Sequence, residues 1–357
     1  MPTTPHTIIK PQKLAATAIG MLEQELIVPS LFQREGVDQY KGAENDTINV
    51  KVEGVLPFHD YAWRNNRSTG IVFDQYVERK IALTFGGNVY SAVKLTDEQN
   101  DFDIKGWNDL LRPQAKAVAR GLSHRCINAL TGAAYNVTIG NVAMNLKGAL
   151  IEARRVMNAF NVPDGNRYML VGSTFESLLL ENDKLGLALN VGDNQAESAL
   201  VNATLGQRYG FKFVVDQTIP ADTAYAFASS GFILATAAPS IPASVAFGAS
   251  TSFEGYALRW IRDYDSEYMQ DRSVVNCYAG VSTVKDVLVG WDQTLNGGLG
   301  LEVVSAAEYF VRGIRLTLDG SSDYPAAASE LAKITGVSDA SVWTPTGRFP
   351  EINAANA

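Results

Sequence analysis

Three acidic residues in the C-terminal half of the chain have the spacing of a cation site. Asp263, Asp265 and Glu267 alternate with other residues, so on a β-strand their carboxylates would share one face. Three such carboxylates could hold a metal ion, which would suit a metal-dependent hydrolase. The same alternation is typical of the solvated side of an antiparallel sheet, where Arg259 and Arg262 could pair with the acids. We favour this second interpretation and keep the hydrolase as an alternative.

The other motifs that could carry chemistry are incomplete. Residues 101–106 resemble the start of a calcium loop, but Arg112 stands where that loop needs a bidentate carboxylate. Residues 248–252 approach a serine nucleophile elbow and lack its last glycine. Residues 297–300 are glycine-rich but lack the third spaced glycine of a dinucleotide site. The sequence has neither a P-loop nor a His-Glu-x-x-His motif.

The histidines and cysteines do not form a reactive set either. His6, His59 and His124 are far apart in sequence, and we interpret them as surface or packing residues rather than a metal site. Cys126 and Cys277 each lie in an apolar stretch, so we predict two buried free thiols, as suits a reducing cytoplasm. Together these patterns predict a protein that is not an enzyme and that binds no metal or cofactor.

The net charge of −8 disfavours a protein that binds specific nucleic-acid sequences, because such proteins usually present a basic surface. An acidic subunit could still enclose DNA without binding it specifically. Residues 1–12 contain three prolines and no apolar run, so we do not expect a signal peptide. Residues 223–253 are uncharged, but Pro239 and Pro242 would break a spanning helix, so we predict buried strands there and no membrane association.

The elements that must position these residues begin with an arm. Leu14, Ile19, Leu22 and Leu26 recur at helical spacing and predict a short amphipathic helix that ends before Pro29. The surrounding segment has too few apolar residues for a core of its own. We therefore expect the arm to dock on another surface.

A long two-stranded hairpin is predicted next, over residues 47–95. Ile48, Val50 and Val52 alternate with polar residues, residues 77–85 alternate again, and a polar tip lies between them at residues 60–70. An isolated hairpin is marginal in water, and no segment nearby in sequence offers it a sheet. The hairpin therefore needs a partner surface.

Short helices and strands alternate in the middle of the chain. Residues 107–130 have helical periodicity, and Pro113 implies either a kink or the start of a second helix. The following pattern predicts a helix at residues 146–160, a turn at 163–165, a strand at 168–171, a helix at 173–180 that Ser173 caps, and a strand at 211–215. Such a succession indicates a compact α/β unit.

The C-terminal part is predicted to be rich in strands. Residues 256–264 and 273–280 could pair across the polar link at 265–272, and residues 284–289 would continue that sheet. Residues 309–318 alternate like one more strand. The remaining pattern predicts a short helix at 326–334 and a polar tail at 344–357.

In order and spacing these elements resemble the major capsid proteins of tailed bacteriophages, which have the Hong Kong 97-type fold. The likeness covers residues 20–290, and four stretches carry it: LIVPSLF at 26–32 with DTINV at 46–50, VYSAVKLTDE at 89–98, VPDGNRYMLV at 162–171 and LGQRYGFKFVV at 205–215. They resemble, in turn, the arm leading into the E-loop, the return of the E-loop into the spine helix, the first strand of the axial domain, and that domain's segment of a glycine followed by a strand.

The resemblance implies an α+β fold with an N-terminal arm, an extended E-loop hairpin, a spine helix, a peripheral-domain sheet and an axial α/β domain. The implied ranges are the arm at 1–45, the hairpin at 46–96, the spine helix at 97–135, the axial domain at 136–247, the peripheral-domain strands at 248–290 and a C-terminal strand or extension at 291–357.

The resemblance also implies a function as a shell subunit in the virion, assembled in the host cytoplasm around double-stranded DNA. Its expected partners are other copies in pentamers and hexamers, a scaffolding protein, a portal protein and a decoration protein. If neighbours complete the hairpin and the arm, the candidate inter-subunit contacts are Phe58, Tyr61, Trp63, Arg64, Arg67, Leu22, Leu26 and Phe32. An encapsulin-like bacterial compartment that houses an enzyme is the alternative within the same fold.

Overall fold

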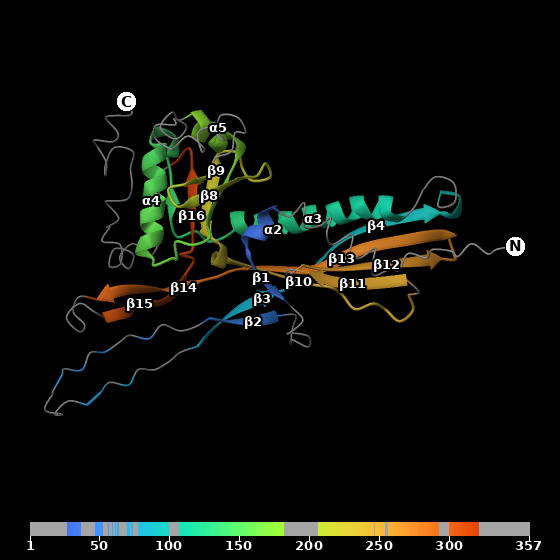
Figure 1. Cartoon of the computed structure of the whole chain (residues 1–357), viewed down its shortest axis with the longest axis horizontal. Helices are drawn as coiled ribbons and strands as arrows, with labels where there is room; N and C mark the ends of the chain where they lie inside the picture. Colours follow the sequence, from blue (N-terminus) through green and yellow to red (C-terminus); the bar gives the residue numbers. More distant parts are fainter. Residues whose placement is uncertain are drawn as a thin grey trace, which may run out of the picture. The chain divides into compact units, whose positions relative to one another are not determined.

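The structure is a computed structural model in which the chain forms two compact units (Figure 1). It describes residues 27–36, 47–52, 78–99, 107–181, 206–245, 247–253, 256–292 and 300–320, and the single positions 56, 59, 61, 63, 70, 71 and 73. The first unit is drawn from residues 1–49, 82–129 and 232–282, and the second from residues 50–81, 130–231 and 283–357. No helix within the described ranges is long and apolar enough to cross a membrane.

The first unit is built on a six-stranded sheet. The strand order is β1-β10-β13-β12-β11, and β4 also pairs with β13. The strands are β1 (Gln33–Gly36), β4 (Asn88–Thr96), β10 (Phe232–Ala237), β11 (Phe247–Phe253), β12 (Tyr256–Asp265) and β13 (Gln270–Thr283). The predicted pairing of residues 256–264 with 273–280 is confirmed, because β12 and β13 are antiparallel with Trp260 opposite Val275.

The long helix α3 (Trp107–Thr131) lies along one face of this sheet (Figure 1). Its buried residues recur every three or four positions, and they are Leu111, Gln114, Ala115, Val118, Ala119, Leu122, Cys126, Ile127 and Leu130. This buried stripe continues on both sides of Pro113, so packing holds one helix together although the proline removes a backbone hydrogen bond. Of the two predicted alternatives, a second helix starting at Pro113 is therefore wrong.

A buried polar network joins α3 to the sheet. The Gln114 amide donates to the main-chain carbonyl of Ser273 at 3.1 Å, and its Oε1 accepts from the Ser273 hydroxyl at 2.9 Å. The Trp260 indole donates to the same hydroxyl at 3.0 Å. Because each of these polar groups has its partner inside the interface, the network stabilises one particular rotation of α3 on the sheet.

The second unit is built on another six-stranded sheet. Its order is β5-β16-β9-β6-β8-β7. The strands are β5 (Thr138–Ile139), β6 (Arg167–Val171), β7 (Gln207–Arg208), β8 (Phe211–Val215), β9 (Thr223–Ala228) and β16 (Gly313–Thr317). The helical elements are α4 (Leu146–Ala159), α5 (Ser173–Glu181) and the single 3₁₀ turns η4 (Val142–Met144) and η5 (Ser229–Gly231). The helices and strands predicted between residues 146 and 215 are confirmed to within one residue at each end.

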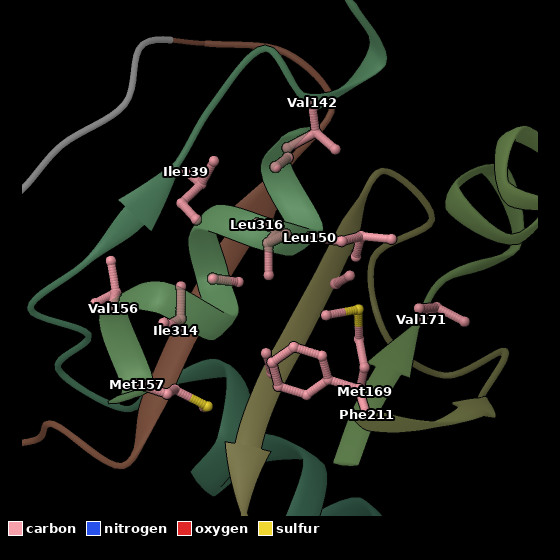
Figure 2. Close-up of a cluster of buried hydrophobic side chains, with 14 of the residues drawn as sticks. Ile139, Val142, Leu150, Val156, Met157, Met169, Val171, Phe211, Ile314 and Leu316 are labelled. Carbon is pink, nitrogen blue, oxygen red and sulfur yellow. The ribbon is translucent and has the colours of Figure 1, made fainter. Parts of the chain in front are cut away.

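One hydrophobic cluster joins α4 and α5 to this second sheet (Figure 2). Its members include Leu150, Val156, Met157, Met169, Val171, Phe175, Phe211, Ile314 and Leu316, all buried. At the start of α4 the Gly148 amide donates to Asn145 Oδ1 at 2.9 Å. This cap satisfies one of the amides that a first helical turn leaves without a backbone partner.

The C-terminal part of the chain departs from the prediction in two ways. The segment after β13 does not continue the first sheet, because β14 (Asp286–Asp292) pairs with β15 (Gly300–Tyr309) in a separate two-stranded sheet. The amide of Val284 donates to the carbonyl of Gly231 at 2.9 Å, which attaches the segment after β13 to the second unit. The strand predicted at 309–318 is confirmed in its second half as β16, which inserts between β5 and β9.

The N-terminal segment contains a short helix, α2 (Ile27–Leu31), that includes Pro29. The helix predicted from Leu14, Ile19, Leu22 and Leu26 lies outside the described residues, so α2 does not test where that helix ends. Pro29 is the third residue of α2, where the amide of any residue would lack an intrahelical partner. The proline consequently costs this first turn no hydrogen bond.

The close approach of α3 to β4 gives a test of the packing. A Cβ added at Gly121 would lie 2.5 Å from Val89 Cγ1, and valine is stiff at χ1. Helix propensity alone would make Gly121→Ala stabilising by about 1 kcal/mol. We expect destabilisation by about 1–3 kcal/mol instead, measured by denaturant unfolding of the subunit, because the methyl overpacks the interface. In a Val89→Ala background the same change should be neutral or stabilising. A Gly121→Ala subunit more stable than wild type would contradict this contact.

The two cysteines, Cys126 on α3 and Cys277 on β13, are buried free thiols, as predicted. Burial raises the pKa of each thiol to about 12, so the reactive thiolate is scarce near neutral pH. We expect an aromatic disulfide reagent at pH 8 to react with neither cysteine in the native subunit and with both in denaturant. Fast labelling of either one under native conditions would show that its side of the α3 interface opens readily.

Candidate assembly surface

A two-stranded hairpin, β2 (Thr47–Val52) paired with β3 (Arg79–Thr84), forms a sheet of its own (Figure 1). At its root the hydroxyl oxygens of Thr47 and Thr84 are hydrogen-bonded at 3.3 Å. Leu83 is fully buried, so the root is held by the packing of its own chain. The hairpin is shorter than the predicted 47–95, because Asn88–Thr96 is strand β4 and its backbone completes the first sheet beside β13.

Large apolar side chains of the hairpin lie in solvent. Trp63 is 90% exposed, Phe73 85%, Ile71 64% and Leu56 48%. Trp63 and Phe73 are the two most exposed of the large hydrophobic residues that the structure describes. Several such side chains in the segment between β2 and β3 indicate an interaction site, because single exposed apolar residues are common but grouped ones are not.

The predicted contact residues fall into three groups. Tyr61, which is half-buried, and the exposed Trp63 both belong to the segment between β2 and β3. Phe58, Arg64, Arg67, Leu22 and Leu26 lie outside the described residues. Phe32 alone forms the third group, because it lies in the hydrophobic core of its own subunit.

Phe32 is 2% exposed, and its ring stacks on Phe232 with centroids 4.7 Å apart. Next to it β1 runs parallel to β10, and the Arg34 guanidinium lies 5.1 Å from the centroid of the Tyr256 ring. Phe32 therefore belongs to the subunit rather than to an inter-subunit contact. Val28, Leu31 and Phe32 are covered by their own chain, which corrects the expectation for Phe32.

Sequence reasoning missed Leu56, Ile71 and Phe73 as contact candidates. Ile71 and Phe73 alternate with other residues in the sequence, a pattern that says only that one face of a strand would be apolar. It does not say whether the same chain covers that face. A signal was nevertheless present, because no second sheet nearby in sequence was available to bury them.

The acidic trio forms ion pairs across the strands. Arg272 on β13 contacts Asp263 at 3.0 Å and Asp265 at 3.3 Å on β12. Glu267 lies in the turn between β12 and β13, so it does not share their face. The solvated-sheet interpretation is confirmed, but with a different arginine from the two that were predicted.

Arg259 and Arg262 have other partners. Arg262 contacts Asp271 at 2.6 Å, and Arg259 donates to Asn276 Oδ1 at 3.0 Å. Partial burial lowers the pKa of Arg259, while the nearby Tyr278 acts in the opposite direction. In the described part of the chain, no three histidine, cysteine, aspartate or glutamate side chains are grouped so as to hold a metal ion.

The remaining motifs can also be located. Residues 248–252 lie in the regular strand β11, paired with β12, and not in a strained elbow. His124 is exposed on α3, with its Nδ1 3.2 Å from the Asn128 amide. His6, residues 101–106 and residues 297–299 lie outside the described residues.

Comparison with known families and structures shows what the chain is similar to. A family model described as phage capsid protein matches residues 88–274. A search of curated protein sequences gave no match.

Among solved structures, a chain of Mycobacterium phage Che8 superimposes with a TM-score of 0.55 at 14% identity, covering 83% of this chain and 92% of that one. The capsid of Cyanophage P-SCSP1u gives 0.54 at 11% identity, covering 83% and 88%. The mature capsid of bacteriophage PhiM1 gives 0.52 at 10% identity, covering 82% and 86%. At these identities the similarity concerns the fold.

Two phenylalanines separate core from assembly surface in a matched test. Phe32→Ala removes a buried, stacked ring and should lower the free energy of unfolding of the subunit by about 3–5 kcal/mol. Phe73→Ala removes a ring that is 85% exposed, so the change should stay within about 0.5 kcal/mol. Denaturant unfolding of unassembled subunits measures both. Similar losses for the two variants would mean that the hairpin packs on its own chain.

Proposed function

The chain belongs to the phage capsid protein family, and from that premise we propose that its copies assemble through the hairpin into an icosahedral shell around double-stranded DNA. The protein is a capsid shell protein with the Hong Kong 97-type fold, as the sequence predicted. Its place is the virion capsid. The finer statements below concern how the subunits join and what else takes part.

The observation that carries the proposal is the exposure of Trp63 and Phe73, at 90% and 85%. Covering one such side chain contributes about 1.5–3 kcal/mol. Aromatic residues are also the side chains that most often dominate interface energies. The hairpin thus provides the apolar anchors that a neighbouring subunit would bury.

The proposed occupant of this surface is a second copy of the chain. If each hairpin lies over the next subunit, the contact joins two different patches and can close into rings of five and six. A stable interface buries on the order of 1,600 Å² in total. A shell divides that requirement among several contacts for each subunit, so the hairpin need not supply it alone.

The two compact units have different proposed roles. We assign the second unit, with its α4 and α5 helices, to the axial domain that points toward the ring centre. The first unit would form the peripheral domain, with α3 along the inner surface of the shell. Maturation would rotate these units as rigid bodies while the shell expands around DNA.

Other proteins complete the proposed pathway. A separate scaffolding protein would guide procapsid assembly in the host cytoplasm, and a portal protein would occupy one vertex. A decoration protein could bind the outer surface. The DNA would be enclosed without sequence-specific binding, in keeping with the net charge of −8.

Removing the hairpin tip tests the proposal. Replacing residues 60–70 by a short Gly-Ser linker should leave soluble, folded subunits, because the paired root of the hairpin remains. Regular shells should be abolished, because Trp63 is lost. Negative-stain electron microscopy and sedimentation measure the outcome. Normal shells from this deletion would exclude the hairpin as the main contact.

A point-substituted variant with a matched control makes the test sharper. Trp63→Ala with Phe73→Ala should raise the protein concentration needed for shell formation more than tenfold, since a loss of about 1.4 kcal/mol already corresponds to tenfold. The control is Met144→Ala with Leu180→Ala, which removes apolar side chains that are 71% and 37% exposed outside the hairpin. The control should assemble like wild type. Shells that contain an enzyme instead of DNA would favour the encapsulin-like alternative.

A further inference from the structure

The outward face of α3 carries a row of basic residues. Arg112, Lys116, Arg120 and His124 follow one another at every fourth position, so they lie along one side of the helix. Arg112, Arg120 and His124 are exposed and Lys116 is half-exposed. The buried stripe of the same helix faces the first sheet, so the row points away from that sheet.

The remaining basic residue of α3 shows that the row is distinct. Arg125 turns back toward the sheet and donates to the carbonyl oxygens of Ala279 at 3.1 Å and Gly87 at 3.3 Å. Arg125 therefore bonds to main-chain carbonyls of the first unit and is not part of the row. Arg112 and Arg120 have no comparable bond to the strands among the described contacts.

The row is unfavourable for the isolated helix. Like charges four residues apart destabilise a helix by about 0.2–0.5 kcal/mol for each pair. Asp109 is the only acidic residue of α3 and lies in its first turn. Within the described part of the chain neither Arg112 nor Arg120 forms an ion pair. A chain with 38 acidic and 30 basic residues thus places four basic side chains along one face of a helix whose sequence contains a single acid.

We infer that this row binds the phosphates of double-stranded DNA inside the shell. The inference rests on the proposed function, because it takes DNA as the polyanion that the shell encloses. The row from Arg112 to His124 extends over about 18 Å of helix axis. Each DNA strand presents a phosphate every ~3.4 Å of its own axis, so one row can meet several phosphates. Arginine is well suited to this, because its planar guanidinium forms paired hydrogen bonds with phosphate oxygens.

The surroundings of the row favour DNA over an acidic protein. The other exposed positions of α3 are Pro113, Ala117 and Asn128, so no exposed side chain described on this helix is large and apolar. A stable protein interface usually needs apolar or aromatic anchors at its centre. Binding to a phosphate backbone needs only positively charged hydrogen-bond donors arranged along the line of the phosphates.

A few contacts for each subunit would make binding weak and sensitive to salt. Many copies lining one shell would add these contacts together, since each further contact becomes intramolecular once DNA is held. The remaining surface, with its net negative charge, would keep the DNA from adhering elsewhere. DNA could then be retained and still move during packaging and release.

The test compares two full-length variants in the unassembled state, below the concentration at which shells form. Arg112→Gln with Arg120→Gln removes two charges from the row, and glutamine keeps a similar helix propensity. Lys94→Gln with Lys285→Gln removes two charges from exposed lysines elsewhere. Binding to a fluorescent random-sequence DNA duplex is measured by anisotropy between about 50 and 200 mM salt, the range over which phosphate contacts lose affinity steeply.

We expect the row variant to lower the slope of log affinity against log salt by about 2, one for each lost contact. Wild type should therefore lose about tenfold more affinity than the row variant over that salt range. The lysine control should keep the wild-type slope. Equal slopes for both variants, or no duplex binding by wild type at low salt, would overturn the inference.

Two further measurements separate the possible causes. In the first, poly-L-glutamate and unlabelled DNA compete with the bound duplex at equal concentrations of negative charge. If poly-L-glutamate displaces the duplex at the lower concentration, the row binds an acidic protein and the DNA assignment is overturned. Electron microscopy should show shells from wild type and from the row variant alike. Shells without DNA binding would reject this inference alone, whereas wild-type subunits that never form shells would reject the proposed function.

Discussion

The seating of α3 on the first sheet is the contact on which the other features of that unit depend. Gln114, Ser273 and Trp260 satisfy one another's hydrogen bonds inside an apolar interface. Rotating the helix would leave these buried groups without partners, at a cost of about 1–3 kcal/mol each. The same rotation would carry Arg112 or Arg120 toward the sheet. One orientation therefore satisfies both the polar network and the charges, and it turns the basic row outward.

This seating also sets where the hairpin begins. Strand β4 pairs with β13 directly under α3, and the chain reaches it from β3 through the buried Leu83. The hairpin is thus rooted in a packed unit while Trp63 and Phe73 stay in solvent. A root packed on its own chain, with exposed apolar side chains beyond it, is the arrangement that we propose a neighbouring subunit uses.

Much of the fold could be read from local pattern. The three-to-four spacing along α3, the alternation of β12 and β13, and the turn before β6 each depend on residues close in sequence. The candidate site could be read only in part. The sequence identified the hairpin as needing a partner and indicated Trp63, but it favoured Phe32 as a contact over Phe73, since residue type alone does not say whether a ring is covered.

The sequence by itself therefore determined the periodic elements, the burial of Cys126 and Cys277, and the presence of a hairpin without a core. Only the tertiary structure decided which distant residues meet. Phe32 is buried because Phe232 arrives beside it, and Arg272 rather than Arg259 neutralises Asp263. Local pattern reports which side of an element is apolar or charged. What covers that side depends on pairings between segments far apart in the chain, and short-range spacing carries no record of them.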